Sequence, residues 1–569
     1  MRAGHAGGGG ADLSVLGAGM IVEKIRKAYE SIRARGERPV WIHVIPEEET
    51  LARAAALDPS LPLYGMTFAI KDNIDLAGVP TTAGCPDYAY TPAKSALVVE
   101  KLMAAGAVPL GKTNLDQFAT GLVGTRSPYG ACSSVFGEQY ISGGSSSGSA
   151  VAVALGLCDF SLGTDTAGSG RVPASFNGLV GLKPTIGALS TEGVVPACKT
   201  LDCVSIFAAE AGLAGRVLGV AREPVRAQRK AWPAKGFRFG VPSAEWLKCF
   251  GDESAPALYE AAIAKFEAQG GVRVEFDYSG FNVVANLLYS GPWVAERLAA
   301  IQEFAAGHPE SLYPVTAKII LGASSLTAVS YFEAAYKLAD LARMTDTEWA
   351  RMDFMLLPTA GSAYTHEEIA AETIALNTNL GYYTNFVNLL DLAALAIPAG
   401  MRSNGIPFGV TLIGPAWSDE ALLATALNQA PYCPEGYVPL AVCGAHLTGQ
   451  PLNHQLTNAG AFLIESCKTS TEYRLYALKG TVPPKPGLFY SPEGGGAAIE
   501  VEVWAVPLDK FGAFVAGVPG PLAIGSGKLE SGRVVKSFVC EGWALGEATE
   551  ITHLGGWRGY LGSQLSKLV

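Results

Sequence analysis

The sequence predicts an α/β fold in a large first domain and a small α+β domain after it. Strand-like runs alternate with helical segments as far as about Ala426, the composition changes at the proline-bearing stretch 430–439, and strand-like runs dominate beyond it. The 569 residues also exceed what one hydrophobic core usually supports. We therefore assign residues 1–14 to a disordered N-terminus, 15–429 to the large domain, 430–439 to a linker and 440–569 to the small domain.

Composition and charge exclude several classes of protein. Hydrophobic residues make up 49% and charged residues 17% of the chain, as in compact globular proteins. No run approaches the roughly 18 to 20 uninterrupted apolar residues of a membrane span, and the N-terminus lacks the pattern of a secretory signal. The net charge of −10 comes without a Lys/Arg block, which favours small molecules over nucleic acids as partners. The ten cysteines form no CxxC pair, so we expect no zinc site, no disulfide framework and a cytoplasmic protein.

Helices are predicted where apolar residues recur every three or four positions, and strands where short apolar runs end at a turn or a proline. In the first helix, 21–34, the residues Ile21, Ile25 and Tyr29 lie on one face, which we expect to cover the core. Further helices are expected at 47–55, 96–105, 150–157, 255–270 and 287–304. Strands are expected at 40–45, 63–75 with its turn, 107–111, 237–242, 272–276, 354–358, 407–414, 440–444, 473–478, 498–504 and 534–539.

Lys71 directly follows the apolar run Phe68-Ala69-Ile70 in a predicted strand. The carboxyl edge of such strands is where the sites of α/β folds are usually assembled. From this segment alone, a functional lysine and an ordinary surface lysine have equal weight.

Two loops rich in glycine and hydroxyl residues, 143–148 and 163–171, bracket the apolar segment 150–157. Glycines expose backbone N–H groups, so such loops build anion or oxyanion cradles, and the apolar segment between them disfavours the alternative of flexible linkers. The interval 44–307 contains no histidine, which excludes a Ser-His-Asp triad local to these loops. A nucleophilic serine here would need Lys71 as its base, with a pKa lowered by burial.

Lys71, the GGSSSG loop and the GTDTAGSGR loop, at their spacing, resemble the amidase signature family. The resemblance covers about 21–426 and implies a mixed central sheet covered by helices. It further implies that Ser169 is the nucleophile, that Ser145, on a cis peptide bond, relays the proton, and that Lys71 is the base. By the same resemblance, the oxyanion hole consists of the backbone N–H groups of Thr166, Ala167, Gly168 and Ser169.

The resemblance to the allophanate hydrolase family is carried by three further segments, 40–43, 194–207 and 385–391. In that family a tyrosine and an arginine eight residues apart on a helix hold the substrate carboxylate, and Tyr289 and Arg297 have this spacing. Eight residues are about 2.2 helical turns, so both side chains are expected to face one pocket. A helix-surface arginine paired with Glu296 or another acid is the alternative.

The small domain is similar to the additional C-terminal domain of that family, which resembles γ-glutamyl cyclotransferases. His446 and His454 lie in the segment 444–454, which resembles the strand-to-loop opening of that fold. The resemblance implies a histidine that breaks down N-carboxycarbamate with loss of CO2, and we favour His446 over His454. Glu502 is interpreted either as the cyclotransferase acid or, equally, as a solvent-facing strand carboxylate beside Glu500.

The resemblance implies an enzyme that hydrolyses allophanate to ammonia and N-carboxycarbamate, which then breaks down to ammonia and CO2, with no metal or organic cofactor. It also implies a homodimer and a functional link to a urea carboxylase or a biuret hydrolase. One alternative is an amidase of another small carboxylated amide, or a glutaminase-type amidotransferase subunit. The other is a non-catalytic binding protein on an amidase scaffold, which the presence of Lys71, Ser145 and Ser169 disfavours.

Overall fold

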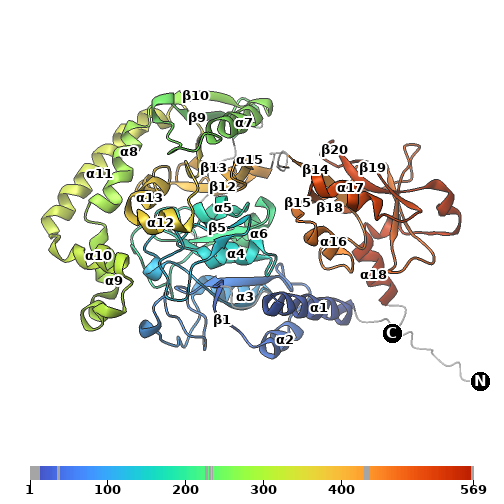
Figure 1. Ribbon diagram of the computed structural model, residues 1–569, viewed down its shortest axis with the longest axis horizontal. Coiled ribbons are helices and arrows are strands. Elements are labelled where there is room, and N and C mark those ends of the chain that lie inside the picture. Colours follow the sequence, from blue (N-terminus) through green and yellow to red (C-terminus); the bar gives the residue numbers. More distant parts are fainter. Residues whose placement is uncertain are drawn as a thin grey trace, which may run out of the picture. The chain divides into compact units, whose positions relative to one another are not determined.

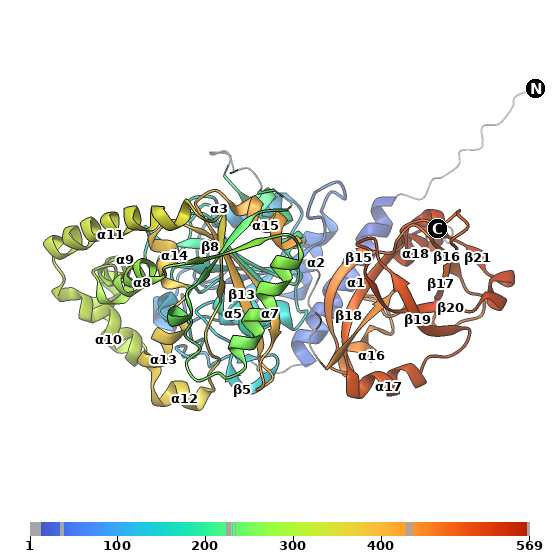
Figure 2. The same ribbon diagram turned by 90° about the horizontal axis from the view of Figure 1, so that it is seen from above.

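The computed structural model of the chain describes residues 13–34, 39–223, 229, 232–233, 235–427, 433 and 436–565 (Figures 1 and 2). It divides into two compact units, of which unit 1 comprises Met1–Lys27 with Pro431–Val569, and unit 2 comprises Ala28–Ala430. The expected disordered segment 1–14 lies outside the described residues except for its last two residues, which begin helix α1 (Leu13–Ala34).

The expected linker, 430–439, is also largely outside the described residues. Strand β14 (Tyr437–Val442) already begins inside that range, so its first three residues pair in a sheet instead of connecting domains.

An 11-stranded mixed sheet forms the centre of unit 2. Its strands lie in the order β1 (Trp41–Val44), β3 (Val108–Thr113), β2 (Thr67–Lys71), β6 (Phe160–Asp165), β8 (Cys203–Ala208), β7 (Val180–Lys183), β12 (Ala393–Met401), β13 (Pro407–Gly414), β11 (Phe354–Pro358), β9 (Arg238–Pro242) and β10 (Val272–Phe276). β2 pairs in parallel with β3 and β6, whereas β6 pairs antiparallel with β8. The predicted fold class, a mixed sheet in a large α/β domain, is confirmed.

Helices cover both faces of this sheet, as the side chains of β11 demonstrate. Phe354 and Leu356 pack into one buried cluster, and the alternate residues Met355 and Leu357 pack into another on the opposite face. A strand that is buried on both faces is apolar at every position, which explains the unbroken apolar run in the sequence. The helices of unit 2 beyond α1 are α2 (Glu47–Ala55), α3 (Leu97–Ala104), α4 (Ser147–Ala154), α5 (Val172–Phe176), α6 (Ala211–Ala221), α7 (Ala255–Ala268), α8 (Ser279–Ser290), α9 (Val294–Gly307), α10 (Pro314–Gly322), α11 (Ala328–Trp349), α12 (His366–Ala371), α13 (Thr373–Leu380), α14 (Asn385–Leu389) and α15 (Asp419–Leu427).

Helices α8 to α11 lie together at one side of unit 2 (Figure 1). The prediction of one helix over 287–304 is wrong, because α8 ends at Ser290 and α9 begins at Val294. Gly291 between them is extended, with φ −99° and ψ −176°. Pro292 follows it, and proline both lacks an N–H and disfavours helical geometry in the residue before it.

Unit 1 contains a five-stranded and a three-stranded sheet. The larger sheet has the order β15 (Phe462–Lys468), β18 (Glu500–Pro507), β14, β20 (Val534–Cys540) and β19 (Leu522–Lys528), and the smaller has the order β17 (Pro486–Tyr490), β16 (Tyr473–Ala477) and β21 (Thr549–Glu550). Its helices, beside the start of α1, are α16 (Asn453–Asn458), α17 (Leu508–Ala516) and α18 (Trp557–Leu565). The four strands predicted for the small domain correspond to β14, β16, β18 and β20.

Within the described residues, no single helix is both long and apolar enough to cross a membrane. One pair, Pro314–Ser325 with Ala328–Trp349, meets the length and composition test only when it is taken together across a bend of 100°.

Candidate active site

The ends of two neighbouring parallel strands bring the candidate residues of unit 2 together. Lys71 is the last residue of β2, and β6, which pairs with β2, leads directly into the loop that carries Ser169. Ser145 lies just before α4, after a short hairpin of β4 (Ser133–Ser134) and β5 (Gly137–Ile141). Both glycine-rich loops therefore meet at the carboxyl edge of the sheet, where α/β folds assemble their sites.

Lys71, Ser145 and Ser169 form one hydrogen-bonded chain. Lys71 Nζ lies 2.8 Å from Ser145 Oγ and 2.7 Å from Thr164 Oγ1, and Ser145 Oγ lies 3.0 Å from Ser169 Oγ. The Gly144–Ser145 peptide bond is cis, as the resemblance implies. All these side chains are buried, with at most 2% of any one exposed. The three residues singled out from the sequence therefore lie in contact.

Burial lowers the pKa of Lys71 to about 7, although the carboxylates of Asp116, Asp202 and Asp165 act in the opposite direction. A neutral lysine is therefore well populated at neutral pH. In that state Nζ has a lone pair that can accept a proton from the Ser145 hydroxyl, and Ser145 Oγ lies where it can accept the proton of Ser169. Such a chain can convert a serine hydroxyl into a nucleophile.

The loop after β6 presents free backbone N–H groups. Those of Thr166, Ala167 and Ser169 donate to no acceptor in the described part of the chain. The N–H of Gly168, by contrast, donates to Asp165 Oδ1 at 2.9 Å. The expectation that Gly168 contributes to an oxyanion hole therefore disagrees with the structure, because this donor is already occupied. The other three donors remain available.

A buried ion pair braces this loop. The Arg171 guanidinium donates to both carboxylate oxygens of Asp165, each at 2.9 Å, and it also donates to the Thr384 carbonyl. Gly170, in the same loop, packs closely against Ser205 of β8, since a Cβ at position 170 would lie 2.5 Å from Ser205 Cβ. The loop geometry therefore depends on packing against β8 as well as on its own sequence.

Arg297 and Tyr289 lie together although they belong to different helices. The Arg297 guanidinium carbon is 5.7 Å from the centre of the Tyr289 ring. Arg297 is 3% exposed and donates to the Ala119 carbonyl and to Thr120 Oγ1, each at 3.2 Å. The carbonyl of the next residue, Gly121, lies 3.5 Å from Ser169 Oγ. One short backbone segment therefore connects the guanidinium to the candidate nucleophile.

The alternative partner of Arg297 is engaged elsewhere. The Glu296 carboxylate accepts hydrogen bonds from the backbone N–H and the hydroxyl of Thr200, at 2.9 and 2.7 Å. No carboxylate among the described residues lies within 4.0 Å of the Arg297 guanidinium. The Arg297–Glu296 pair considered as an alternative is therefore absent from this part of the chain, and a buried guanidinium faces no acidic partner.

The sequence interpretation missed three residues of this site. Thr164 accepts from Lys71, Asp202 accepts from the Thr166 hydroxyl and from two backbone N–H groups, and Asp116 accepts from two more. All three are polar residues at or just beyond the ends of buried strands. That position was the available signal, because a polar group buried there needs a partner.

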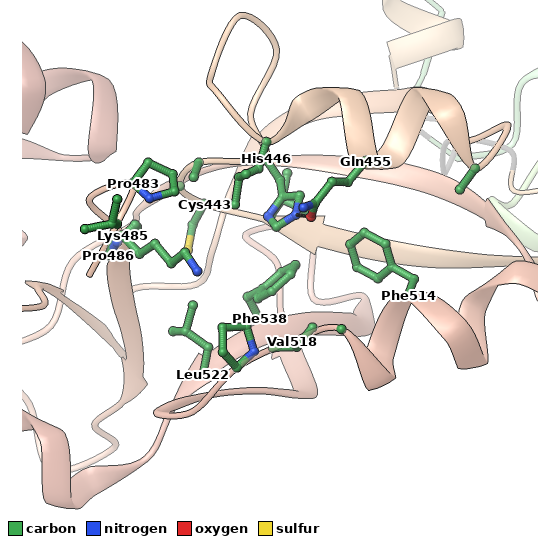
Figure 3. A pocket seen from close by; sticks show the side chains of 18 of the residues that line it. Cys443, His446, Gln455, Pro483, Lys485, Pro486, Phe514, Val518, Leu522 and Phe538 are labelled. Carbon is green, nitrogen blue, oxygen red and sulfur yellow. Dashed lines mark hydrogen bonds between the residues drawn. The ribbon is translucent and has the colours of Figure 1, made fainter. Parts of the chain in front are cut away.

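In unit 1, His446 lines a cavity of about 540 Å³ (Figure 3). Its Nε2 lies 2.9 Å from Gln455 Oε1, and its ring stacks on Phe538 with 4.9 Å between centres. Burial lowers the pKa of this imidazole. His454 is exposed, its Nδ1 lies 2.9 Å from the Pro451 carbonyl, and it does not line the cavity. Of the two candidate histidines, only His446 therefore faces this cavity.

Glu502 agrees with neither interpretation of the sequence. It is 3% exposed, so it does not face solvent, and it does not line the cavity. Its carboxylate accepts from the N–H and hydroxyl of Thr448 at 2.7 and 2.9 Å, from Arg558 at 2.7 Å and from the Trp504 indole at 3.2 Å. A strand carboxylate with this many donors braces the loop at Thr448.

Comparisons with known proteins identify the family of each region. The Amidase family matches residues 25–423, and the allophanate hydrolase C-terminal domain matches residues 438–562. The solved structure of Kluyveromyces lactis allophanate hydrolase is 42% identical, with a TM-score of 0.69, over 95% of this chain and 96% of that one.

Two curated relatives extend the comparison. Urea amidolyase of Saccharomyces cerevisiae is 43% identical over 91% of this chain, which spans only 31% of that longer protein. A glutamyl-tRNA(Gln) amidotransferase subunit from Streptococcus pneumoniae is 33% identical over 71% of this chain and 91% of its own length. The chain is therefore an amidohydrolase that belongs to the amidase family, and an allophanate hydrolase C-terminal domain follows its amidase region.

Proposed function

We propose that the chain hydrolyses allophanate, using Ser169 as nucleophile, Ser145 as proton relay and Lys71 as base. The observation that carries this proposal is that Arg297 lies near the relay. Its guanidinium is buried and has no carboxylate partner among the described residues. A substrate carboxylate would supply that partner, because guanidinium and carboxylate pair through two charge-assisted hydrogen bonds. Tyr289, whose ring lies beside the guanidinium, would form the other wall of this carboxylate site.

In the first step, neutral Lys71 takes a proton from Ser145, which takes the proton of Ser169. Ser169 Oγ attacks the terminal amide carbonyl of allophanate, and the developing oxyanion accepts from the free N–H groups of Thr166, Ala167 and Ser169. The relay then returns the proton to the leaving nitrogen, and ammonia departs.

In the second step, water cleaves the acyl-enzyme with Lys71 again acting as base through Ser145. The product is N-carboxycarbamate, which contains one nitrogen between two carboxylates. Its breakdown to carbamate and CO2, and then to ammonia and CO2, gives two ammonia and two CO2 for each allophanic acid and water consumed. We assign this breakdown to the His446 cavity of unit 1.

The relatives support this choice of substrate. Similarity to the Kluyveromyces lactis allophanate hydrolase extends over both units, whereas similarity to the amidotransferase subunit covers 71% of the chain. We further propose that allophanate comes from a urea carboxylase or from a biuret hydrolase. The name of the longer yeast relative, urea amidolyase, favours the first source.

We also propose a cytoplasmic homodimer. The ten cysteines are free thiols, which fits a reducing compartment. On α11, Val329, Phe332 and Tyr336 are 66%, 54% and 67% exposed and share one helix face, a pattern suited to a second copy of the chain. Light scattering of the chain and of the Phe332→Glu/Tyr336→Glu variant tests this: a dimer that becomes a monomer supports it, and a monomeric parent contradicts it.

An ammonia-release assay on four substrates tests the proposed function. Allophanate should be hydrolysed fastest, malonamate more slowly, because it keeps the carboxylate and the terminal amide, and biuret and glutamine far more slowly. Preference for glutamine would instead support a glutaminase-type subunit, and no release from any substrate would support a binding protein. A Ser190→Ala variant, which alters a serine of the loop before Glu192, serves as the unaffected control.

A further inference from the structure

A turn at residues 197–202, which we name the connector turn, lies between the loop after β6 and the start of α9. The Cys198 carbonyl accepts from the backbone N–H groups of Leu201 and Asp202, each at 2.8 Å. The Asp202 carboxylate folds back over the turn and accepts from the N–H groups of Ala197 and Cys198, at 2.8 and 3.2 Å. Cys198, Leu201 and Asp202 are also buried. The connector turn is therefore held in one shape by its own hydrogen bonds.

One side of the connector turn is fixed to the loop after β6. The Thr166 hydroxyl donates to the Asp202 carboxylate, and Thr166 also carries one of the N–H groups that are free in the described part of the chain. Asn388 forms a second bridge, because its side-chain amide donates to the Asp165 carbonyl at 2.8 Å and to the Leu201 carbonyl at 3.0 Å. A displacement of the free N–H groups therefore requires a displacement of the turn.

The other side of the connector turn is fixed to the first residues of α9. The backbone N–H and the hydroxyl of Thr200 donate to the two carboxylate oxygens of Glu296, at 2.9 and 2.7 Å. The Cys198 thiol donates to the carbonyl of Trp293, just before α9, at 3.4 Å. Cys198 and Trp293 also pack in one apolar cluster with Ala167 of the loop after β6. Hydrogen bonds and buried contacts thus connect α9 to that loop through the turn.

The guanidinium of Arg297 has a connection of its own to the nucleophile. It donates to the segment 119–121, in which the Gly121 carbonyl lies 3.5 Å from Ser169 Oγ. Arg297 directly follows Glu296, so its backbone is held by the connector turn and its guanidinium by this segment. The two connections together set the separation between the guanidinium and the free N–H groups of the loop after β6.

We propose that the connector turn sets the length of the substrate, with Thr200, Glu296 and Asp202 as positioning residues. The inference rests on the proposed function, in which Arg297 holds the substrate carboxylate and the loop after β6 holds the oxyanion. In allophanate, one nitrogen separates the carboxylate carbon from the amide carbonyl carbon. A set separation of the two holding groups accepts one atom at this place and disfavours none or two, because a misplacement of about 1 Å costs on the order of a hundredfold in rate.

Three carboxylated amides of different length test this proposal. Oxamate, malonamate and succinamate place no atom, one atom and two atoms between the carboxylate carbon and the amide carbonyl carbon. The kcat/KM of the full chain is measured for each of them by ammonia release. We expect the parent to hydrolyse malonamate at least about 10²-fold faster than either of the other two.

Variants on the α9 side of the connector turn should relax this preference. Glu296→Ala removes both acceptors of Thr200, and Thr200→Val removes the hydroxyl donor. Each should lower the malonamate-to-succinamate ratio of kcat/KM by about threefold to tenfold, as expected for the loss of one or two hydrogen bonds. Thr200→Ser keeps a hydroxyl and should keep the parental ratio. Glu303→Ala, which alters an exposed glutamate of the same helix, is the matched control and should also keep it.

A variant on the other side of the turn should have the same effect. Thr166→Val removes the hydroxyl that donates to Asp202 and should lower the ratio, whereas Thr166→Ser should keep it. The ratio does not depend on the folded fraction of a variant, because both substrates report on the same folded molecules. A role limited to bracing the fold would therefore leave the ratio unchanged even where activity falls.

Two results would overturn the proposal: a parent that hydrolyses oxamate or succinamate as fast as malonamate, or a parental ratio in Glu296→Ala, Thr200→Val and Thr166→Val. If the parent hydrolyses allophanate but these variants keep the ratio, only the role of the connector turn fails. If the parent does not hydrolyse allophanate but prefers malonamate and loses this preference in the variants, the proposed function fails while the role of the turn stands. A preference of the parent for uncharged amides would overturn both.

Discussion

The two candidate sites differ in how their polar groups are satisfied before any ligand binds. In unit 2, Lys71, Ser145 and Ser169 are buried and bonded to one another. In unit 1, the groups around the His446 cavity include Lys485, which pairs with no carboxylate, and several free N–H groups within the described structure. The first arrangement prepares a nucleophile and a base in advance, whereas the second prepares a place for an incoming anion. The difference fits the proposals of covalent chemistry in unit 2 and of proton transfer to a bound anion in unit 1.

The largest effect is expected for Ser169→Ala, which should inactivate the site of unit 2 and leave the site of unit 1 unchanged. Ser169→Ala should lower the rate of ammonia release from allophanate at least about 10⁴-fold, because no covalent step remains. The NMR signal of the His446 ring should stay unchanged in this variant. Substantial ammonia release by Ser169→Ala would contradict the assignment of the nucleophile.

Replacing Arg297 separates substrate recognition from the relay. Arg297→Met should lower kcat/KM for allophanate by about 10²- to 10³-fold, because a desolvated carboxylate loses a bidentate partner. Activity on an uncharged small amide should change by less than about threefold if the relay is intact. Arg297→Lys keeps the charge without the two-pronged geometry and should fall between the parent and Arg297→Met. Equal losses on charged and uncharged amides would instead indicate a structural role for Arg297.

The pH dependence addresses the base. Because burial lowers the pKa of Lys71 to about 7, and only the neutral amine accepts a proton, kcat/KM should rise with pH and level off above about 7. Thr164→Val removes an acceptor that favours protonated Lys71, so the rise should move to lower pH by about half a unit to one unit. Thr359→Val, which alters a buried threonine bonded to Thr411, is the matched control and should not move it. A shift toward higher pH in Thr164→Val would contradict this account of Lys71.

The smallest expected effect concerns the loop of unit 1. Glu502→Gln keeps the shape of the side chain but loses its charge beside Arg558, so the stability of unit 1 should fall by about 1–3 kcal/mol. The rate of the first ammonia release should not change. Thermal denaturation followed by the fluorescence of Trp504, against a Trp504→Phe background control, measures the first effect. A loss of the first hydrolysis without a loss of stability would contradict a bracing role.

Much of the relay of Lys71, Ser145 and Ser169 could be predicted, because each of these residues lies in a recognisable short sequence pattern. The apolar run before Lys71 and the glycines around Ser145 and Ser169 each have a physical meaning that a single segment reveals. Because no histidine lies between 44 and 307, Lys71 was the candidate for the base. The break between α8 and α9 also has a local signal, since Gly291 and Pro292 both disfavour a helix. The prediction of one helix over 287–304 did not use this signal.

Other features depend on contacts that no local pattern reveals. The Gly168 N–H is occupied because Asp165 folds back onto its own loop. Glu502 is buried because Thr448 and Arg558, 54 and 56 residues away, converge on it. The donors around the His446 cavity become visible only when the segments carrying His446 and Lys485 are brought together. Long-range packing therefore decides which polar groups are free to act.

The most direct test of the central claim is acid quenching of the full chain during turnover of ¹⁴C-allophanate, followed by peptide mapping. The acyl group on a serine loses CO2 in acid and leaves a carbamoyl ester that mass spectrometry locates. The account predicts label on the peptide that carries Ser169, slower labelling in Ser145→Ala, and none in Ser169→Ala. Label on another residue, or continued turnover of allophanate without label at Ser169, would contradict it.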